Sequence, residues 1–350
     1  PTTSNIASVN EVVGYNLFST TLYTGTGGTQ TINTGINNTS EALVWIKSRE
    51  SSGYDHALTD SVRGAGNVLF SSISDGETSY PTSLLSFDSD GFTLGSDAFV
   101  NSSTGGSNQF VAWNFKAAPG FMDIVKYEGD GSDGGTFQVI QHSLNSEPTF
   151  IITKGLEGSS NWLVYHKDAV ESGFPALQNL LYLNTPSALR TGSTDKWGVT
   201  NSTFSITNNK DLGEDYVAYL FADTPGLIKC GGYTGNGDNS LTRLIETGFN
   251  PGFLLVKSVT DSGDWYMLDL ERGDGKTLFA DLNQQELTYS DAIIKDNGFV
   301  VNSNLNKDTK EYIYIAIAED AGSPDETELT LTDATDLPYF QAGDKVEGLD

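Results

Sequence analysis

The chain has 350 residues, of which 37% are hydrophobic and 11% aromatic, and its formal net charge is −27. Nineteen basic against 46 acidic side chains repel phosphate groups, which argues against a nucleic-acid partner and against an anionic membrane surface. No run approaches the ~20 apolar residues of a membrane span, and residues 1–10 lack the pattern of a signal peptide, so neither membrane insertion nor ordinary secretion is expected.

A set of landmarks recurs three times along the chain, at intervals of about one hundred residues. A Tyr-x-Gly-x-Gly string begins at Tyr23, Tyr127 and Tyr233. Each string is followed by an apolar run ending in lysine, a polar-aromatic step, an aromatic strand and a turn ending in glycine. These lie at residues 42–47, 54–56, 110–115 and 120, then 149–154, 161–162, 216–221 and 226, then 253–257, 264–265, 312–317 and 322. The repetition predicts a tandem array of three similar units.

The predicted organisation follows from these landmarks and from the changes of composition at the two ends. We expect a polar lead-in at the N-terminus, three repeats, and an acidic β-type connector to further sequence or to a partner. The bounds are residues 1–20, 21–120, 121–226, 227–322 and 323–350.

Short runs of β-branched and aromatic residues, bounded by Gly, Asn, Asp or Ser, predict an all-β fold. Several strands per unit, with turn signals about every ten residues, favour β-sandwiches of the jelly-roll or concanavalin type. Asp90-Gly91 and Asn297-Gly298 predict equivalent type I′ hairpins in the first and third units, whereas the middle unit has a different turn. The best helix candidate, residues 175–181, is one or two turns long.

Tests for chemistry give no reaction centre, and we expect no enzyme. The three histidines have no metal-ligand spacing, no Gly-x-Ser-x-Gly elbow is present, and the acidic residues form no glycosidase-like pair. The single cysteine, Cys230, is expected to be a buried small hydrophobe. No cofactor is expected, with Ca²⁺ left open at the turn aspartates of residues 88–90 and 130–133, where hydrogen bonding to the local backbone is the alternative interpretation.

Aromatic side chains are the best candidates for ligand binding, because flat apolar rings beside polar groups suit sugar recognition. We take Trp162 and Trp265 as candidate platforms, with Asn161 and Asp264 beside them as hydrogen-bonding partners. The alternative, favoured by about two to one, places both tryptophans in a sandwich core.

The third repeat resembles the tandem modules of tail-fibre and other appendage proteins of marine tailed bacteriophages. The residues that carry the resemblance are 233–237, 248–257, 264–269, 296–299 and 312–316, and the first repeat matches at 23–25, 44–47, 60–64, 89–92 and 111–113. The middle repeat is looser, since it lacks the Asp-Gly turn and the Arg-Gly step. The resemblance covers residues 20–322 and implies lectin-like β-sandwiches, with no catalytic residues.

The function that the resemblance implies is a virion structural protein, in a tail fibre or related appendage that adheres to the host surface. The expected partners are a host-envelope glycan or receptor, other virion proteins, and further copies of the chain, with a homotrimer favoured. The expected location is the virion. Two alternatives stay open: a capsid decoration or architectural protein without receptor binding, and a polysaccharide-degrading tail spike.

Overall fold

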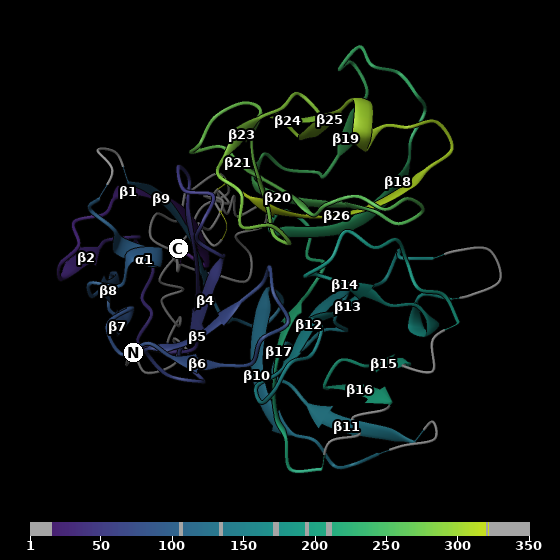
Figure 1. The fold of residues 1–350 in the computed structure, drawn as a ribbon. Helices are drawn as coiled ribbons and strands as arrows, with labels where there is room; N and C mark the ends of the chain where they lie inside the picture. Colours follow the sequence, from purple (N-terminus) through teal and green to yellow (C-terminus); the bar gives the residue numbers. More distant parts are fainter. Residues whose placement is uncertain are drawn as a thin grey trace, which may run out of the picture.

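The computed structural model describes residues 16–104, 108–132, 136–170, 175–192, 196–207, 212–319 and 321. The lead-in before residue 16 and the connector from residue 323 lie outside this described part. The described chain is nearly all β, as predicted, and its strands pair antiparallel in several sheets. Figure 1 shows three groups of strands arranged around a common centre.

Each third of the described chain forms a larger sheet and a three-stranded sheet, and we call these strand sets 1, 2 and 3. Set 1 consists of β1 (Phe18–Thr24), β2 (Gln30–Ile32), β3 (Ala42–Ser48), β4 (Ala57–Asp60), β5 (Asn67–Phe70), β6 (Thr78–Ser79), β7 (Leu84–Asp88), β8 (Gly91–Leu94) and β9 (Gln109–Lys116). Set 2 consists of β10 (Met122–Glu128), β11 (Phe137–Gln141), β12 (Phe150–Gly155), β13 (Leu163–His166), β14 (Leu181–Tyr182), β15 (Trp197–Val199), β16 (Thr203–Thr207) and β17 (Asp215–Phe221). Set 3 consists of β18 (Ile228–Thr234), β19 (Leu244–Glu246), β20 (Pro251–Ser258), β21 (Tyr266–Asp269), β22 (Lys276–Phe279), β23 (Leu287–Thr288), β24 (Ala292–Lys295), β25 (Gly298–Val301) and β26 (Glu311–Ala318).

The order of strands is the same in the three sets, except that the larger sheet of set 2 ends at its fifth strand in the described chain. The larger sheets run β1-β9-β3-β4-β5-β6, β10-β17-β12-β13-β14 and β18-β26-β20-β21-β22-β23. The small sheets run β2-β8-β7, β11-β16-β15 and β19-β25-β24. The three-fold repetition in the sequence is therefore also a repetition of strand order.

Both faces of the central strands are buried, which explains their nearly continuous apolar runs. In β20, Phe253 and Leu255 face the other two sets, whereas Leu254 and Val256 face the small sheet of set 3. Successive side chains point to opposite faces of a strand, so an alternating pattern would have marked one wet face. Here every residue of β20 is buried.

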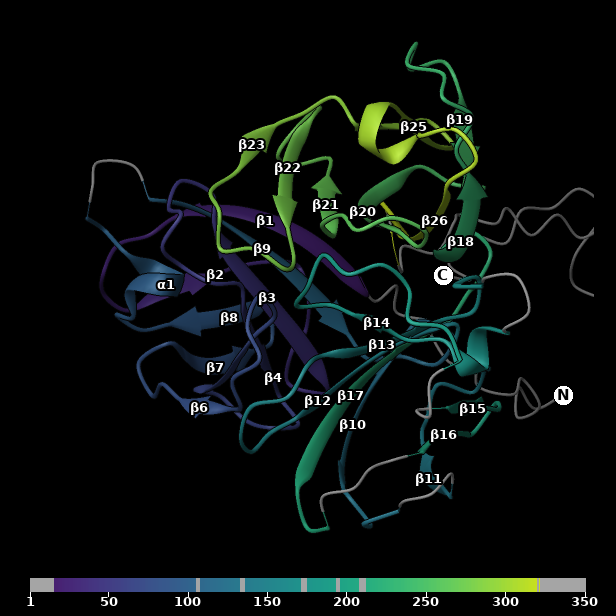
Figure 2. The same cartoon turned by 45° about the vertical axis from the view of Figure 1, so that its right-hand side comes forward.

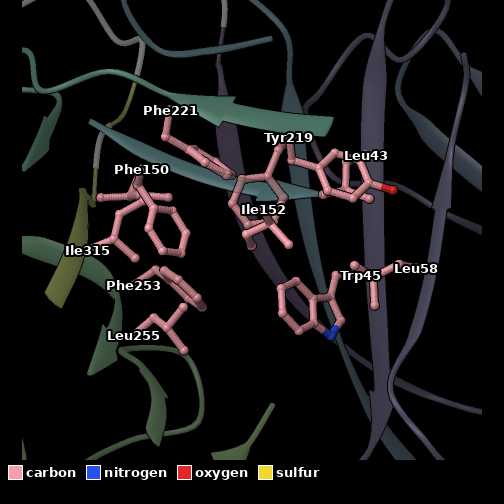
Figure 3. Close-up of a pocket in the computed structure, with 12 residues that line it drawn as sticks. Leu43, Trp45, Leu58, Phe150, Ile152, Tyr219, Phe221, Phe253, Leu255 and Ile315 are labelled. Carbon is pink, nitrogen blue, oxygen red and sulfur yellow. The ribbon is translucent and has the colours of Figure 1, made fainter. Parts of the chain in front are cut away.

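One hydrophobic core joins the three sets, and each set has a second core under its own small sheet. A small apolar cavity, with about 20 Å³ of space for a water-sized sphere, lies where the larger sheets meet (Figure 3). Each set lines it with four residues: Leu43, Trp45, Leu58 and Phe115, then Phe150, Ile152, Tyr219 and Phe221, then Phe253, Leu255, Ile315 and Ile317. Because the lining consists of apolar side chains of the shared core, we interpret the cavity as a gap in the packing of that core.

Equivalent backbone hydrogen bonds connect the sets in a closed ring. The turned view in Figure 2 shows the three strand sets arranged around their common centre. In each bond, the donor is a backbone amide in the loop after the fifth strand of one set's larger sheet. The acceptor is the backbone carbonyl of the residue that follows the third strand of another set's larger sheet. The bonds are Glu286 N to Arg49 O (2.7 Å), Glu77 N to Leu156 O (2.7 Å) and Leu189 N to Val259 O (2.9 Å). We name the three contacts the 1–3, 1–2 and 2–3 junctions after the sets that they join.

Buried side chains reinforce two of these junctions. Trp113 Nε1 donates to Asp269 Oδ2 over 2.9 Å at the 1–3 junction, and Tyr219 OH donates to Asp60 Oδ2 over 2.8 Å at the 1–2 junction. Each of these carboxylates also accepts from the arginine three residues later, Arg272 or Arg63. At the 2–3 junction the equivalent of the aspartate is His166, whose Nε2 lies 3.1 Å from the carbonyl of Tyr314.

The two ends of the described body meet. Leu17 N donates to Ala321 O over 2.9 Å, and Phe18 lies with its ring 5.5 Å from that of Phe253. The chain passes from set 1 to set 2 through the turn at Gly120, and from set 2 to set 3 through the turn at Gly226. Between set 3 and set 1, the hydrogen bond of Leu17 with Ala321 stands where a third such connection would be. Set 3 therefore returns the chain to set 1.

Some local predictions need correction. The helix candidate at residues 175–181 holds only a 3₁₀ turn, η1 (Ala176–Gln178); the other helical turns of the described chain are α1 (Ala98–Asn101) and η2 (Ser303–Leu305). The two hairpins exist, but their turns are not type I′, because only Asn297 of the central turn residues has a positive φ. The different turn of set 2 is confirmed as a three-residue loop between β15 and β16.

Candidate functional site

The predicted sugar platforms are buried. Trp162 and Trp265 are 0% and 1% exposed, and their indole N–H groups donate to carbonyls of neighbouring sets, at Phe70 (3.0 Å) and Tyr182 (2.9 Å). Burial of both rings corrects the platform hypothesis in favour of the core alternative, because an external sugar cannot stack on them.

The polar partners of those rings, Asn161 and Asp264, do not meet at one site either. Asn161 is exposed beside the 1–2 junction, whereas Asp264 is half-buried at the 2–3 junction. Each lies next to a junction tryptophan, so the structure gives both a local role at the edge of a junction.

Within the described residues, no group of three or more His, Cys, Asp or Glu side chains is placed to hold a metal ion. Asp88 accepts from Ser86 Oγ and Thr93 Oγ1, each over 2.7 Å, and Asp90 accepts from Gly35 N over 2.9 Å. At the second turn, Ser132 N donates to Asp130 Oδ1 over 2.9 Å, which is the local backbone bond that the alternative interpretation expects, whereas the donors to Asp88 are side chains and Gly35 is distant in sequence from Asp90. Asp133 lies outside the described part. Cys230 is buried as predicted, and burial raises the pKa of its thiol to about 12.

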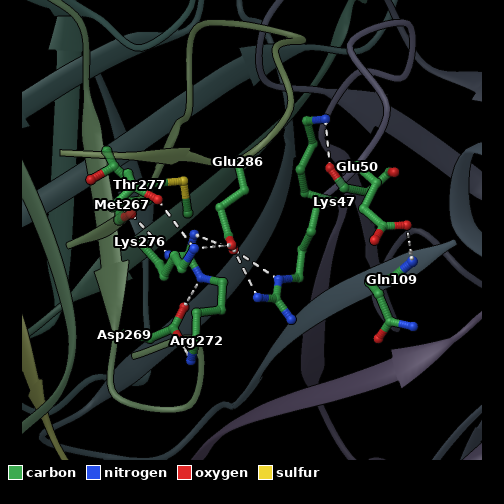
Figure 4. A network of polar contacts seen from close by, with 12 residues as sticks. Lys47, Glu50, Gln109, Met267, Asp269, Arg272, Lys276, Thr277 and Glu286 are labelled. Carbon is green, nitrogen blue, oxygen red and sulfur yellow. Dashed lines mark hydrogen bonds and ion pairs between the residues drawn. The ribbon is translucent and has the colours of Figure 1, made fainter. Parts of the chain in front are cut away.

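The best open site is a polar hollow of about 400 Å³ at the 1–3 junction (Figure 4). Two strand ends and one loop form it: the end of β3, the start of β9 and the loop between β22 and β23. Its lining residues are Arg49, Glu50, Gln109, Gln285 and Glu286. We call it the 1–3 hollow.

Backbone bonds fix the frame of the 1–3 hollow. Arg49 N donates to Gln109 O over 2.8 Å, and Glu286 N donates to Arg49 O over 2.7 Å. Glu50 Oε2 accepts from Gln109 N over 3.2 Å, while Gln109 Nε2 donates to Thr24 Oγ1 over 2.9 Å. The side chains of the hollow therefore project from a backbone that pairing holds in place.

An ion pair spans the 1–3 hollow. Arg49 donates to both carboxylate oxygens of Glu286, through Nε over 2.8 Å and Nη2 over 3.0 Å, and this hydrogen bonding raises the pKa of the guanidinium. Arg272 and Lys276 lie farther from the same carboxylate, at 3.7 and 3.9 Å. Glu286 is thus held by cations, and the hollow is suited to binding by hydrogen bonds.

The sequence reasoning missed the 1–3 hollow, although a comparison of the three repeats would have marked it. Arg49 occupies the position of Leu156 and Val259, as the matching backbone bonds show. Gln109 likewise occupies the position of Asp215 and Glu311 at the start of the closing strand. One junction alone thus has an arginine and a neutral amide at these two positions.

A family model matches residues 14–321 of the chain, and its description is Domain of unknown function (DUF7483). No curated protein and no solved structure matches the chain. The matched range includes all three strand sets and both residues, Leu17 and Ala321, at which the ends of the body meet.

Proposed function

The chain belongs to this family of unknown function, and we propose that it is a non-enzymatic structural protein of a phage virion, in a tail fibre or related appendage that contacts the host surface. The observation that supports the proposal best is that the buried charged, histidine and tryptophan side chains form hydrogen bonds that hold the strand sets together. Both buried Asp–Arg pairs, three of the tryptophans and His166 hold junctions together. What such a body offers a partner is its surface.

We propose further that the three strand sets are β-sandwich modules with the predicted bounds 21–120, 121–226 and 227–322. The closed arrangement brings three modules together in one chain, as a trimer would do with separate chains. Sedimentation of the purified protein measures whether copies associate further, and a homotrimer is the expected species.

The 1–3 hollow favours a protein that contacts the host over an architectural protein without receptor binding. The hollow is open, and it combines amides, carboxylates and a guanidinium oriented by Glu286, which are groups that bond to hydroxyls. A host-envelope glycan is a ligand of that chemistry. Weak single contacts suffice where several copies are tethered on one appendage.

Binding to host cells tests the proposal. Gln109→Ala and Gln285→Ala remove lining amides and should reduce the amount of protein captured, whereas Gln284→Ala, next to the hollow but not lining it, should leave capture unchanged. Equal capture of all three variants would rule out the 1–3 hollow as the contact. New reducing ends after incubation with envelope polysaccharide would favour the tail-spike alternative, and absence of capture would favour a decoration protein.

A further inference from the structure

Each strand set has two equivalent side chains next to its polar-aromatic step, and sets 1 and 2 join them by a hydrogen bond. In set 1, Ser72 Oγ donates to Asp55 Oδ1 over 2.7 Å. In set 2, Asn184 Nδ2 donates to Asn161 Oδ1 over 2.9 Å, and the other end of the Asn184 amide accepts from Trp162 N over 3.0 Å. In both sets the second side chain is the donor and the first is the acceptor.

Set 3 places two carboxyl groups, Asp264 and Asp281, at these positions. Asp281 Oδ1 accepts from Trp265 N over 2.9 Å, just as Asn184 accepts from Trp162. Asp281 is only 5% exposed, and its Oδ2 has no hydrogen-bond partner among the described residues. An ionised carboxylate has no donor, so the bond that Asn184 makes can form here only if Oδ2 carries a proton.

We propose that Asp281 holds a proton and donates it in a hydrogen bond to Asp264, and that this acid pair fastens the loop of residues 259–264 to set 2. The loop reaches set 2 at Pro186, whose carbonyl accepts from Gly263 N over 2.8 Å and from Ser262 Oγ over 3.0 Å. Loss of the proton leaves two neighbouring carboxylates, which repel each other. The 2–3 junction then loosens as the pH rises.

The surrounding charges favour a proton over a metal ion as the bridging species. Lys257 on β20 is the cation that faces the pair, and its Nζ donates to Ser258 O over 2.9 Å. Asp261, the other carboxylate of the loop, is paired with Lys310 over 2.7 Å. One proton makes the two carboxyls and the Lys257 ammonium neutral together, whereas a divalent cation would leave the same three groups with a net charge of about +1.

The loss of stabilisation is complete near neutral pH. Burial first, and the neighbouring Asp264 charge as well, raise the pKa of Asp281 to about 7. Because this pKa lies above the ordinary value of 3.8, the pair stabilises the fold fully below the ordinary pKa and loses its effect as the pH rises through the folded value.

The test compares Asp281→Asn, which supplies the amide found at Asn184, with the unchanged protein. We expect the protection of the Gly263 and Leu189 amides from hydrogen exchange, corrected for intrinsic rates, to fall by up to tenfold per pH unit between pH ~4 and pH ~7 in the unchanged protein and to level off above pH ~7. In Asp281→Asn it should stay level. Asp55→Asn removes a carboxylate at the equivalent position of set 1 and should keep the original pH profile.

The same pH profile in Asp281→Asn and the unchanged protein would overturn the proposal. If Asp281→Asn does not fold, Asp264→Asn provides the test. Removal of the neighbouring charge should lower the pH at which the protection of the Gly263 and Leu189 amides levels off. An unchanged pH profile in Asp264→Asn would contradict the acid pair. A fall in the protection of these amides on addition of a chelator at pH ~6, reversed by added calcium, would show that a metal ion bridges the carboxyls. That result would also overturn the proposal.

Discussion

At the scale of single residues, each buried carboxylate at a junction accepts several hydrogen bonds and should therefore contribute strongly to the stability of the fold. Asp269 is buried and accepts from Trp113, from the backbone of Arg272 and from its guanidinium. Asp269→Ala should lower the free energy of unfolding by about 3–5 kcal/mol, because it leaves a buried guanidinium without its partner. Asp274→Ala, which removes an exposed carboxylate 3.7 Å from Lys295, should cost at most about 1 kcal/mol. Urea unfolding measures both, and equal losses would contradict the account.

His166 gives the 2–3 junction a dependence on acid. Its Nδ1 accepts from Asp168 N over 3.1 Å, and burial lowers the pKa of the ring to about 4. The unfolded chain therefore binds the proton first, so stability should fall as the pH drops from about 6.5 to about 4, by up to about 1.4 kcal/mol per unit. His166→Gln should flatten this part of the profile in thermal melts. An unchanged slope in the variant would show that other groups cause it.

At the scale of elements, the hairpin between β7 and β8 depends on one glycine. Gly91 has a φ of +115°, and a Cβ there would lie 2.0 Å from the carbonyl oxygen of Ile32. Gly91→Ala should destabilise the protein by more than the ~1–3 kcal/mol of backbone strain alone. Gly28→Ala has open space and an ordinary φ, so it should be neutral or slightly stabilising in the same urea experiment. A neutral Gly91→Ala would contradict the described turn.

The elements also show what the sequence could predict and what it could not. Strand periodicity and turn residues predict the all-β fold and both hairpins, and the tendency of a free cysteine to pack as a small hydrophobe predicts the burial of Cys230. The run at residues 253–257 predicts a strand, and its unbroken apolar character also indicates two buried faces, as the shared core requires. The 1–3 hollow escaped because its side chains come from β3, from β9 and from a loop more than 150 residues farther along. Residue spacing does not encode such a meeting.

At the scale of the whole molecule, the closed ring replaces the expected string of separate units. Since Leu17 and Ala321 meet, joining the ends of the body and opening the chain at Gly226 should keep the same contacts. This circular permutant should fold, with the circular dichroism spectrum of the original. A permutant that stays unfolded, while an opening at Gly120 also fails, would show that the chain ends do not complete a third link.

Calorimetric unfolding tests the shared core most directly. If the three sets unfold as one body, a single transition should appear, with a van't Hoff enthalpy close to the calorimetric enthalpy of about 0.7 kcal/mol per residue. Three transitions, or a van't Hoff enthalpy of about one third of the calorimetric value, would show that the sets are independent units and would contradict the closed ring.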